Sequence, residues 1–170
     1  MVGERLERRG LPFMLTGSFA LAFYATPRMT RDLDIVVALA TADVEGLVEE
    51  FAPEFFIDAD MAREAIQQER MFNLMHFESG IKVDLIVRKR AAYRLAEFER
   101  RQPVQVAGLR TWIVSREDLV LSKLVWALET RSEQQMRDIA SLLAGPADLG
   151  YIRHWASTLG VAALLDEVVK

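Results

Sequence analysis

The sequence predicts an α+β fold, in which a mixed β-sheet with flanking helices is followed by a C-terminal helical bundle. Two observations predict it. Short apolar runs rich in β-branched residues are typical of strands, and they lie at 11–15, 33–39, 71–77, 81–87 and 109–114. From Ser115 onward every segment has a helical pattern of apolar residues. We therefore expect a core over residues 1–114 and a helical region over residues 115–170, packed on that core.

The composition is that of a globular protein with no membrane segment. The chain has 170 residues, of which 51% are apolar, enough to bury a core. Its formal net charge of −4 excludes a protein that is basic all over, so a nucleic acid could be contacted only locally. Cysteine is absent, which excludes disulfides and thiolate metal sites. No apolar run is long enough for a membrane span, and the start, MVGERLERRG, is too charged for a signal peptide, so we expect a cytoplasmic protein.

The stretch 16–37 carries two carboxylates at the start of a predicted strand. Successive side chains of a strand point to opposite faces, so Asp32 and Asp34 share one face. Two carboxylates about 4 Å apart repel by about 4 kcal/mol at an effective dielectric constant of roughly 20. A bound cation would remove this cost, and oxygen-only ligands favour Mg²⁺ or Mn²⁺.

Two further features belong with this acid pair. The Gly17-Ser18 turn opens an apolar helix, and the free amides of a helix N-terminus suit a phosphate. Residues 71–77 and 81–87 predict a hairpin, and Asp84 lies in the middle of its second strand between apolar neighbours. A lone charge there would be costly, so Asp84 is a third candidate acid.

The segment 88–101, RKRAAYRLAEFERR, carries six basic and two acidic residues, a local charge of +4. One helical stripe contains Arg90, Arg94, Glu97 and Arg101. Because the segment directly follows the strand of Asp84, this stripe could lie near the site and hold a polyanion. A solvated helix face explains the charges equally well, and both interpretations stay open.

Together these residues resemble the nucleotidyltransferase superfamily with the polymerase-beta-type fold. Its signature is matched by Leu15-Thr16-Gly17-Ser18, a spacer, Asp32-Leu33-Asp34-Ile35, and Asp84 as the later third acid. Further segments are similar to the small bacterial AbiEii-like nucleotidyltransferases: Arg28-x-Thr30-x-Asp32-Leu-Asp34, Phe72-Asn-Leu-Met-His76, Lys82-Val-Asp84, Glu117-Asp-Leu-Val-Leu-Ser-Lys123-Leu, Ser132-Glu-Gln-Gln-Met-Arg-Asp138-Ile and the tail 151–161.

The resemblance implies a metal-dependent transfer of an NMP group from an NTP, such as ATP, to a protein or RNA acceptor, tRNA included. It also implies a toxin–antitoxin or phage-defence system, with a cognate antitoxin or toxin as partner. Asp32, Asp34 and Asp84 would hold Mg²⁺ or Mn²⁺, and Asp84 would also take the proton of the acceptor.

The remaining implied roles concern the nucleotide. Gly17 and Ser18 would meet the triphosphate, with Arg28 and Thr30 also among the nucleotide-binding residues. Lys123, an ammonium on a largely apolar helix face, would meet a phosphate from the helical side. Asp138 would orient Lys123.

Two alternatives remain open. Lys123 and Asp138 could instead form an ion pair that only holds two helices together. Larger AbiEii-type toxins carry an Arg-Asp-x-x-Asp motif, of which this chain keeps Asp138 and has Gln135 at the first Asp. This departure motivates a non-catalytic, antitoxin-like protein that binds a nucleotide or a partner.

A DxD glycosyltransferase is disfavoured, because it explains neither Gly17-Ser18 nor Asp84. The sequence leaves the oligomeric state open.

Overall fold

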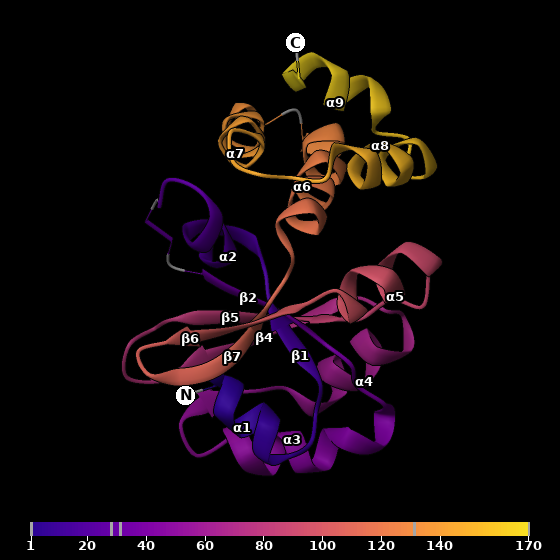
Figure 1. The fold of residues 1–170 in the computed structure, drawn as a ribbon. Helices are drawn as coiled ribbons and strands as arrows, with labels where there is room; N and C mark the ends of the chain where they lie inside the picture. Colours follow the sequence, from indigo (N-terminus) through magenta and orange to yellow (C-terminus); the bar gives the residue numbers. More distant parts are fainter. Residues whose placement is uncertain (1, 28, 31, 131, 170) are drawn as a thin grey trace.

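A single mixed sheet organises the protein (Figure 1). The computed structural model describes residues 2–27, 29–30, 32–130 and 132–169. In this part of the chain the sheet has seven strands in the order β3-β4-β5-β2-β1-β7-β6. The strands are β1 (Phe13–Leu15), β2 (Asp32–Val37), β3 (Phe55–Phe56), β4 (Met71–His76), β5 (Lys82–Val87), β6 (Gln102–Val106) and β7 (Leu109–Ile113).

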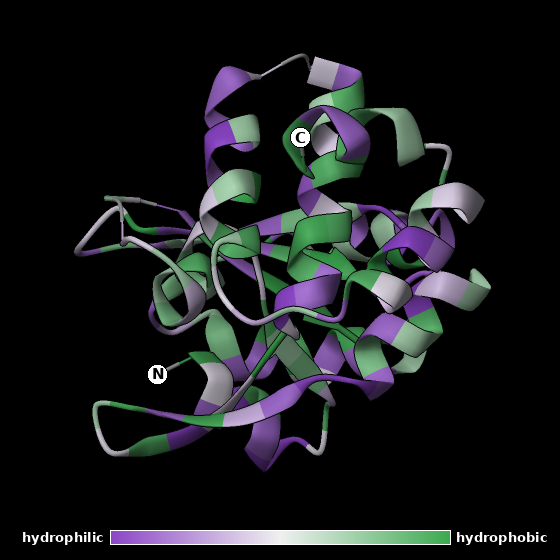
Figure 2. Ribbon diagram, turned by 45° about the horizontal axis from the view of Figure 1, so that its top comes forward, coloured by the Kyte–Doolittle hydropathy of each residue, from purple (hydrophilic) through white to green (hydrophobic). Residues whose placement is uncertain are grey.

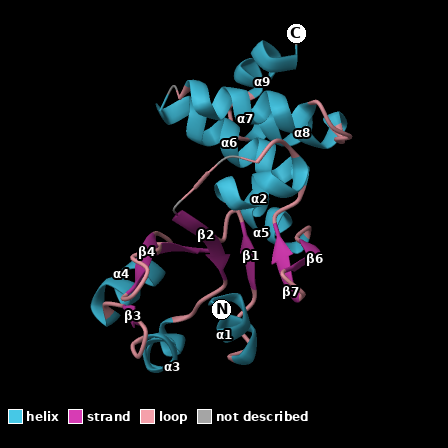
Figure 3. Cartoon of the chain, turned by 90° about the vertical axis from the view of Figure 1, so that its left-hand side faces the viewer, coloured by secondary structure: helices cyan, strands magenta, loops and turns pink. Residues whose placement is uncertain are grey.

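Helices cover both faces of the sheet (Figures 1 and 3). One face is packed by α1 (Val2–Arg8), α3 (Val44–Phe51), which follows a 3₁₀ turn (Thr41–Asp43), and α4 (Ala59–Gln67). The other face is packed by α2 (Gly17–Tyr24), α5 (Ala92–Glu99), α6 (Arg116–Thr130), α7 (Glu133–Leu143), α8 (Leu149–Thr158) and α9 (Ala162–Val169). We call this second side the helical face.

The alternation of β2 explains why the site lies on the helical face. Ile35 and Val37 are fully buried in the core that contains α1, α3 and α4. Val36 packs against the other core, so Asp32 and Asp34 point to the same side as Val36. Figure 2 shows that hydrophobic residues concentrate on the strands inside the molecule, whereas many outward helix turns are hydrophilic. Hydrophobic burial on both faces therefore fixes which way the acids point.

The sheet is mixed, as the sequence predicts, but the sequence analysis did not predict two of its strands, β3 and β6. β2 pairs with β5 in parallel, while β1–β2 and β4–β5 are antiparallel. The two-residue β3 and the strand β6 form the two edges of the sheet. β6 contains Pro103, which argues against a central strand but is tolerated at an edge.

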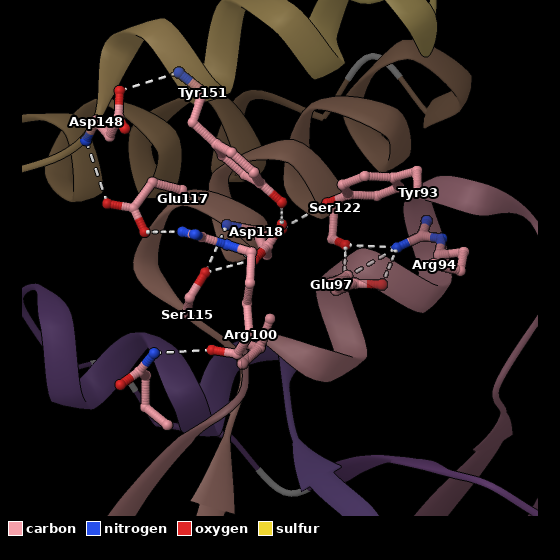
Figure 4. A network of polar contacts seen from close by, with 12 residues as sticks. Tyr93, Arg94, Glu97, Arg100, Ser115, Glu117, Asp118, Ser122, Asp148 and Tyr151 are labelled. Carbon is pink, nitrogen blue, oxygen red and sulfur yellow. Dashed lines mark hydrogen bonds and ion pairs between the residues drawn. The ribbon is translucent and has the colours of Figure 1, made fainter.

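A buried carboxylate joins the C-terminal helices to the sheet (Figure 4). Asp118, in the first turn of α6, is fully buried. It accepts hydrogen bonds from Ser115 (2.5 Å), from Nε of Arg100 (3.1 Å) and from the hydroxyl of Tyr151 (2.8 Å). These partners come from the β7–α6 junction, the end of α5 and α8, so one side chain fixes three segments against each other.

The helical region follows the sheet directly, because α6 begins three residues after β7. Its helices share one buried core with α2 and α5. The division at residues 114 and 115 remains a prediction from the sequence. No helix among the described residues is long and apolar enough to cross a membrane.

Candidate active site

Two aspartates face each other across neighbouring strands. In the parallel pairing of β2 with β5, Asp34 lies opposite Asp84. Both side chains point to the helical face, because residues in register on adjacent strands share a face. Asp32, the exposed first residue of β2, lies two positions away on the same face. The structure thus brings together the three acids that the sequence singled out.

Asp84 is the most deeply placed of these acids, with 5% of its surface exposed. Its Oδ2 lies 3.0 Å from the ammonium of Lys82. Its Oδ1 is buried and accepts no hydrogen bond from any described residue. A buried carboxylate oxygen without a partner is costly, so this atom is suited to an incoming proton or cation.

The pKa of Asp34 is affected by its burial and by the carboxylates close to it. Burial raises the pKa of Asp34 above its ordinary value, and the charges of Asp84 and Asp32 raise it further. The ammonium groups of Lys82 and Lys123 act in the opposite direction but do not cancel the shift. Burial and the neighbouring carboxylates therefore disfavour the charged form of Asp34.

Gly17 makes room for Asp34 at the start of α2. Its φ is +62°, a left-handed conformation that glycine adopts at little cost. A Cβ at this position would overlap with Oδ2 of Asp34. The strand and the turn are also joined through the backbone, because the amide of Thr16 donates to the carbonyl of Asp34 at 2.9 Å. Glycine is required here for both conformation and space.

The other proposed nucleotide contacts are Ser18, Thr30 and Arg28. The side chain of Thr16, the N-cap residue of α2, makes no capping hydrogen bond, and Ser18 in the first turn is half-buried. Thr30 precedes β2, and its Oγ1 donates to the carbonyl of Asp32 at 3.1 Å. Arg28 lies outside the described residues. An open hollow of about 490 Å³, within the size range of ligand pockets, is lined by Phe19, Thr30, Asp32, Leu33, Ser79, Gly80 and Ile81.

Lys123 connects the helical region to the acids. It is 5% exposed, and its Nζ donates to Asp138 on α7 at 2.7 Å and to Oε1 of Gln135 at 3.1 Å. Its charge still lowers the pKa of Asp34. The inter-helix ion pair considered in the sequence analysis is therefore present, and Asp138 is placed to orient Lys123 as the resemblance implies.

The structure adds two residues for which the sequence suggested no role. Lys82 pairs with Asp84, and Asn73 on β4 lies opposite Asp84 in the antiparallel register. The position of Asn73 could have been found from the predicted hairpin, because the turn of a hairpin fixes which residues of its two strands face each other. Gln135 keeps a hydrogen-bond acceptor beside Lys123 although it is not a carboxylate.

The donor set fits a hard divalent cation in its chemistry. Its candidate ligands are all carboxylate oxygens, as Mg²⁺ and Mn²⁺ prefer, and the Oδ1 of Asp84 has no partner among the described residues. In the part of the chain that the structure describes, no three acidic or histidine side chains form a ready-made metal cluster. Metal binding by Asp32, Asp34 and Asp84 remains a prediction.

The fold is shared with solved nucleotidyltransferases. The antibiotic-resistance factor ANT(2″)-Ia has a TM-score of 0.59 at 16% identity, with 96% of this chain and 90% of that chain covered. An antigenic nucleotidyltransferase-like protein from Paracoccidioides brasiliensis has a TM-score of 0.57 at 14% identity (84% and 72% covered). A putative nucleotidyltransferase from Thermotoga maritima has a TM-score of 0.53 at 17% identity (80% and 86% covered). At such identities the likeness concerns the fold alone.

Comparison with family models goes further than the fold. Residues 5–140 match the model described as "Nucleotidyl transferase AbiEii toxin, Type IV TA system". The chain belongs to this family and is a nucleotidyltransferase. A search of curated proteins finds no match. The superfamily resemblance and the α+β fold predicted from the sequence are confirmed.

Replacing Gly17 by alanine tests the close approach to Asp34. Gly160→Ala is the matched control, because Gly160 also has a left-handed φ (+71°) but nothing lies within 4 Å of its added Cβ. We expect Gly160→Ala to lower the free energy of unfolding by about 1–2 kcal/mol, the usual cost of that conformation. Gly17→Ala should cost more, because Asp34 must also move. Urea denaturation measures both, and equal losses would contradict the interpretation.

The charge on Asp34 should make stability depend on pH in the absence of metal. Between the ordinary aspartate pKa of about 4 and the raised pKa of Asp34, the folded state binds more protons than the unfolded state, so stability falls as the pH rises. In EDTA at neutral pH, Asp34→Asn should therefore melt above the wild type, and the gap should close towards pH 4. Asp166→Asn, at an exposed position on α9, should show no such gap. A gap independent of pH would refute this electrostatic account.

Proposed function

We propose that this nucleotidyltransferase moves an NMP group from an NTP to an RNA or protein acceptor with the help of a divalent cation. The observation that carries the proposal is the register of Asp34 with Asp84. Oδ1 of Asp84 is buried and has no hydrogen-bond partner among the described residues, and Asp34 lies beside the turn at Gly17. Membership of the family supports nucleotidyl transfer itself.

The reaction needs an acceptor hydroxyl to be deprotonated as it attacks the α-phosphorus. The new phosphorus–oxygen bond forms while the bond to the pyrophosphate leaving group breaks. In our proposal the carboxylate of Asp84 accepts the hydroxyl proton, and Lys82 pairs with its Oδ2. A divalent cation bound to Asp32, Asp34 and Asp84 would supply charge stabilisation and alignment of the reacting oxygens.

The triphosphate would lie at the N-terminus of α2. The helix dipole and the first amides favour negative charge there, and Gly17 lets the backbone approach the phosphates. Ser18 would donate its hydroxyl, with Thr30 and Arg28 nearby in sequence. Lys123 would contribute positive charge from α6, and Asp138 would hold it in place.

A second candidate function, nucleotide or partner binding without turnover, is favoured by one observation. Lys123 is already engaged by Asp138 and Gln135, so its ammonium is not fully available to a phosphate. In this antitoxin-like alternative the ion pair stabilises the helical region only. The proposed setting of a cytoplasmic toxin–antitoxin pair accommodates both functions.

Thermal unfolding tests ligand binding at the acids. Mg²⁺ with an NTP should raise the melting temperature, because a ligand that binds only the folded state stabilises it by RT ln(1 + [L]/Kd). Asp32→Asn should abolish the rise, whereas Asp166→Asn, which removes an equal charge at an exposed site, should retain it. Screening the four NTPs identifies the preferred base. An equal rise in Asp32→Asn would place the ligand elsewhere.

Label transfer distinguishes the two functions. The protein is incubated with NTPs labelled at the α-phosphate, Mg²⁺ and cell extract, and labelled RNA and protein are separated. We expect label on one of these acceptors with the wild type and none with Asp34→Ala. If nucleotide binds but no label is transferred, and a partner co-purifies stably, the non-catalytic alternative holds. Transfer by Asp34→Ala at the wild-type level would refute the assigned site.

A further inference from the structure

The basic segment after β5 is divided by the structure into arginines with and without a counter-charge. Arg94 lies 2.8 Å from the buried Glu97, and Arg100 lies 3.1 Å from the buried Asp118 (Figure 4). Arg90 is exposed and pairs with Glu69 at 3.6 Å. The charge of these three arginines is thus matched by carboxylates of the protein itself. Arg94 is thus paired with a carboxylate of its own helix, a contact that neither sequence interpretation considered.

Arg88 and Arg101, which flank this helix, differ from the others. Both are half-buried, and both lie over the ring of Phe98, with Cζ 5.2 Å and 4.6 Å from its centroid. Arg101 also lies 5.0 Å from the ring centroid of Trp112. No ion pair joins either guanidinium to a carboxylate among the described residues. Two cations therefore lie against the same aromatic ring, that of Phe98, in a chain whose net charge is negative.

The hydrogen bonding of these two arginines is also incomplete. The Nε atoms of Arg88 and Arg101 are buried, and neither donates to any described residue. Burial lowers the pKa of Arg101, and the neighbouring charge of Arg88 lowers it further. The pair thus combines like-charge repulsion with unused donors, and both would be relieved by an anion with several acceptor oxygens.

We propose that Arg88 and Arg101 form a binding site for a phosphate group. The planar guanidinium matches the oxygens of a phosphate in a bidentate manner, and two of them supply charge for a dianion or for successive phosphodiesters. This site is separate from the acid cluster and does not depend on the proposed transfer reaction.

Groups of the protein itself satisfy only part of this arginine pair. Nη1 of Arg101 donates to the carbonyl of Phe98 at 2.8 Å, which places one cation at the C-terminal end of α5. The helix dipole and the ring faces therefore stabilise positive charge. Ring faces do not accept the in-plane N–H groups, however, and among the described residues the Phe98 carbonyl accepts a side-chain hydrogen bond from Arg101 and not from Arg88. Arg88 has no such acceptor among the described residues.

The location of the pair suggests how a long substrate could reach it. Arg88 follows β5, and its amide continues the strand pairing by donating to the carbonyl of Val37 at 2.9 Å. Alternation places its side chain on the helical face, like that of Asp84. Four residues of strand span about 13 Å. A nucleic acid whose reacting end lies at the acids could thus have a backbone phosphate at Arg88, and a free phosphate or nucleotide is the other source of the same chemistry.

The test uses the full chain without metal or NTP. Binding of a short, labelled single-stranded RNA is followed by fluorescence anisotropy over a series of salt concentrations. Inorganic phosphate is titrated separately, with thermal unfolding and the fluorescence of Trp112 as readouts, and Trp112→Phe identifies that signal. The variants are Arg88→Gln, Arg101→Gln and the double variant. Arg137→Gln is the matched control, because Arg137 is an exposed arginine on α7 that loses the same charge.

Loss of the arginines should weaken binding in one of two ways. If a nucleic-acid backbone is the ligand, each Gln variant should reduce the slope of log K against log salt by about 0.7, and Arg137→Gln should leave it unchanged. If a free anion is the ligand, the phosphate-induced rise in melting temperature should be lost in the double variant while RNA binding persists. Either result supports the site. Equal RNA and phosphate binding by the double variant and by Arg137→Gln would overturn it.

Arg101→Lys separates ligand binding from capping of α5. Lysine keeps the positive charge at the helix end but lacks the planar fork, so it should retain the wild-type melting temperature while phosphate binding falls. Should Arg101→Gln unfold, Arg88→Gln together with Arg101→Lys still decides the question. Full phosphate and RNA binding by that pair of substitutions would contradict the proposal. Activity at the acid cluster enters none of these readouts.

Discussion

The repulsion between Asp34 and Asp84 is the constraint on which the rest of the site depends. Parallel pairing of β2 with β5 places the two carboxylates in register, and the hydrophobic residues between them fix the face to which they point. A protein selected only for stability would not keep this arrangement, because burial and the charge of Asp84 both disfavour the charged form of Asp34. Local conflict of this kind is typical of functional sites.

The surroundings of the acids are arranged in two layers. Gly17 and Lys82 act within the sheet and the turn beside it, the first by leaving space and the second by neutralising one oxygen. Lys123 acts from the helical region, where Gln135 and Asp138 share its donors. Gln135 is neutral, so this chain has one negative charge fewer around Lys123 than the Arg-Asp-x-x-Asp pattern of larger toxins would give. More of the lysine's positive field is therefore left to act on Asp34.

Much of this site could be predicted from the sequence, because its signals are local. Alternation places Asp32 and Asp34 on one face, and the hairpin that carries Asp84 has an ordinary turn glycine. The contacts of Asp118 and Glu97 could not be predicted, since their partners are distant in sequence or depend on how α5 packs against α6. For the same reason the charge of the segment 88–101 was ambiguous: buried carboxylates matched some of its arginines and not others. The strand β6 could not be predicted, because a proline such as Pro103 is tolerated in an edge strand but not in a central one, and the sequence does not show which strands lie at the edges.

The edges of the sheet limit how this protein can associate with another chain. One edge is β3, which has two residues, and the other is β6, whose Pro103 has no amide hydrogen to donate. Short strands and prolines are the means by which natural sheets avoid pairing with foreign strands. A partner that binds by adding a strand would find few backbone groups to pair with. Recognition of this protein by another macromolecule is therefore expected to depend on its side chains, and to be changed by single surface substitutions.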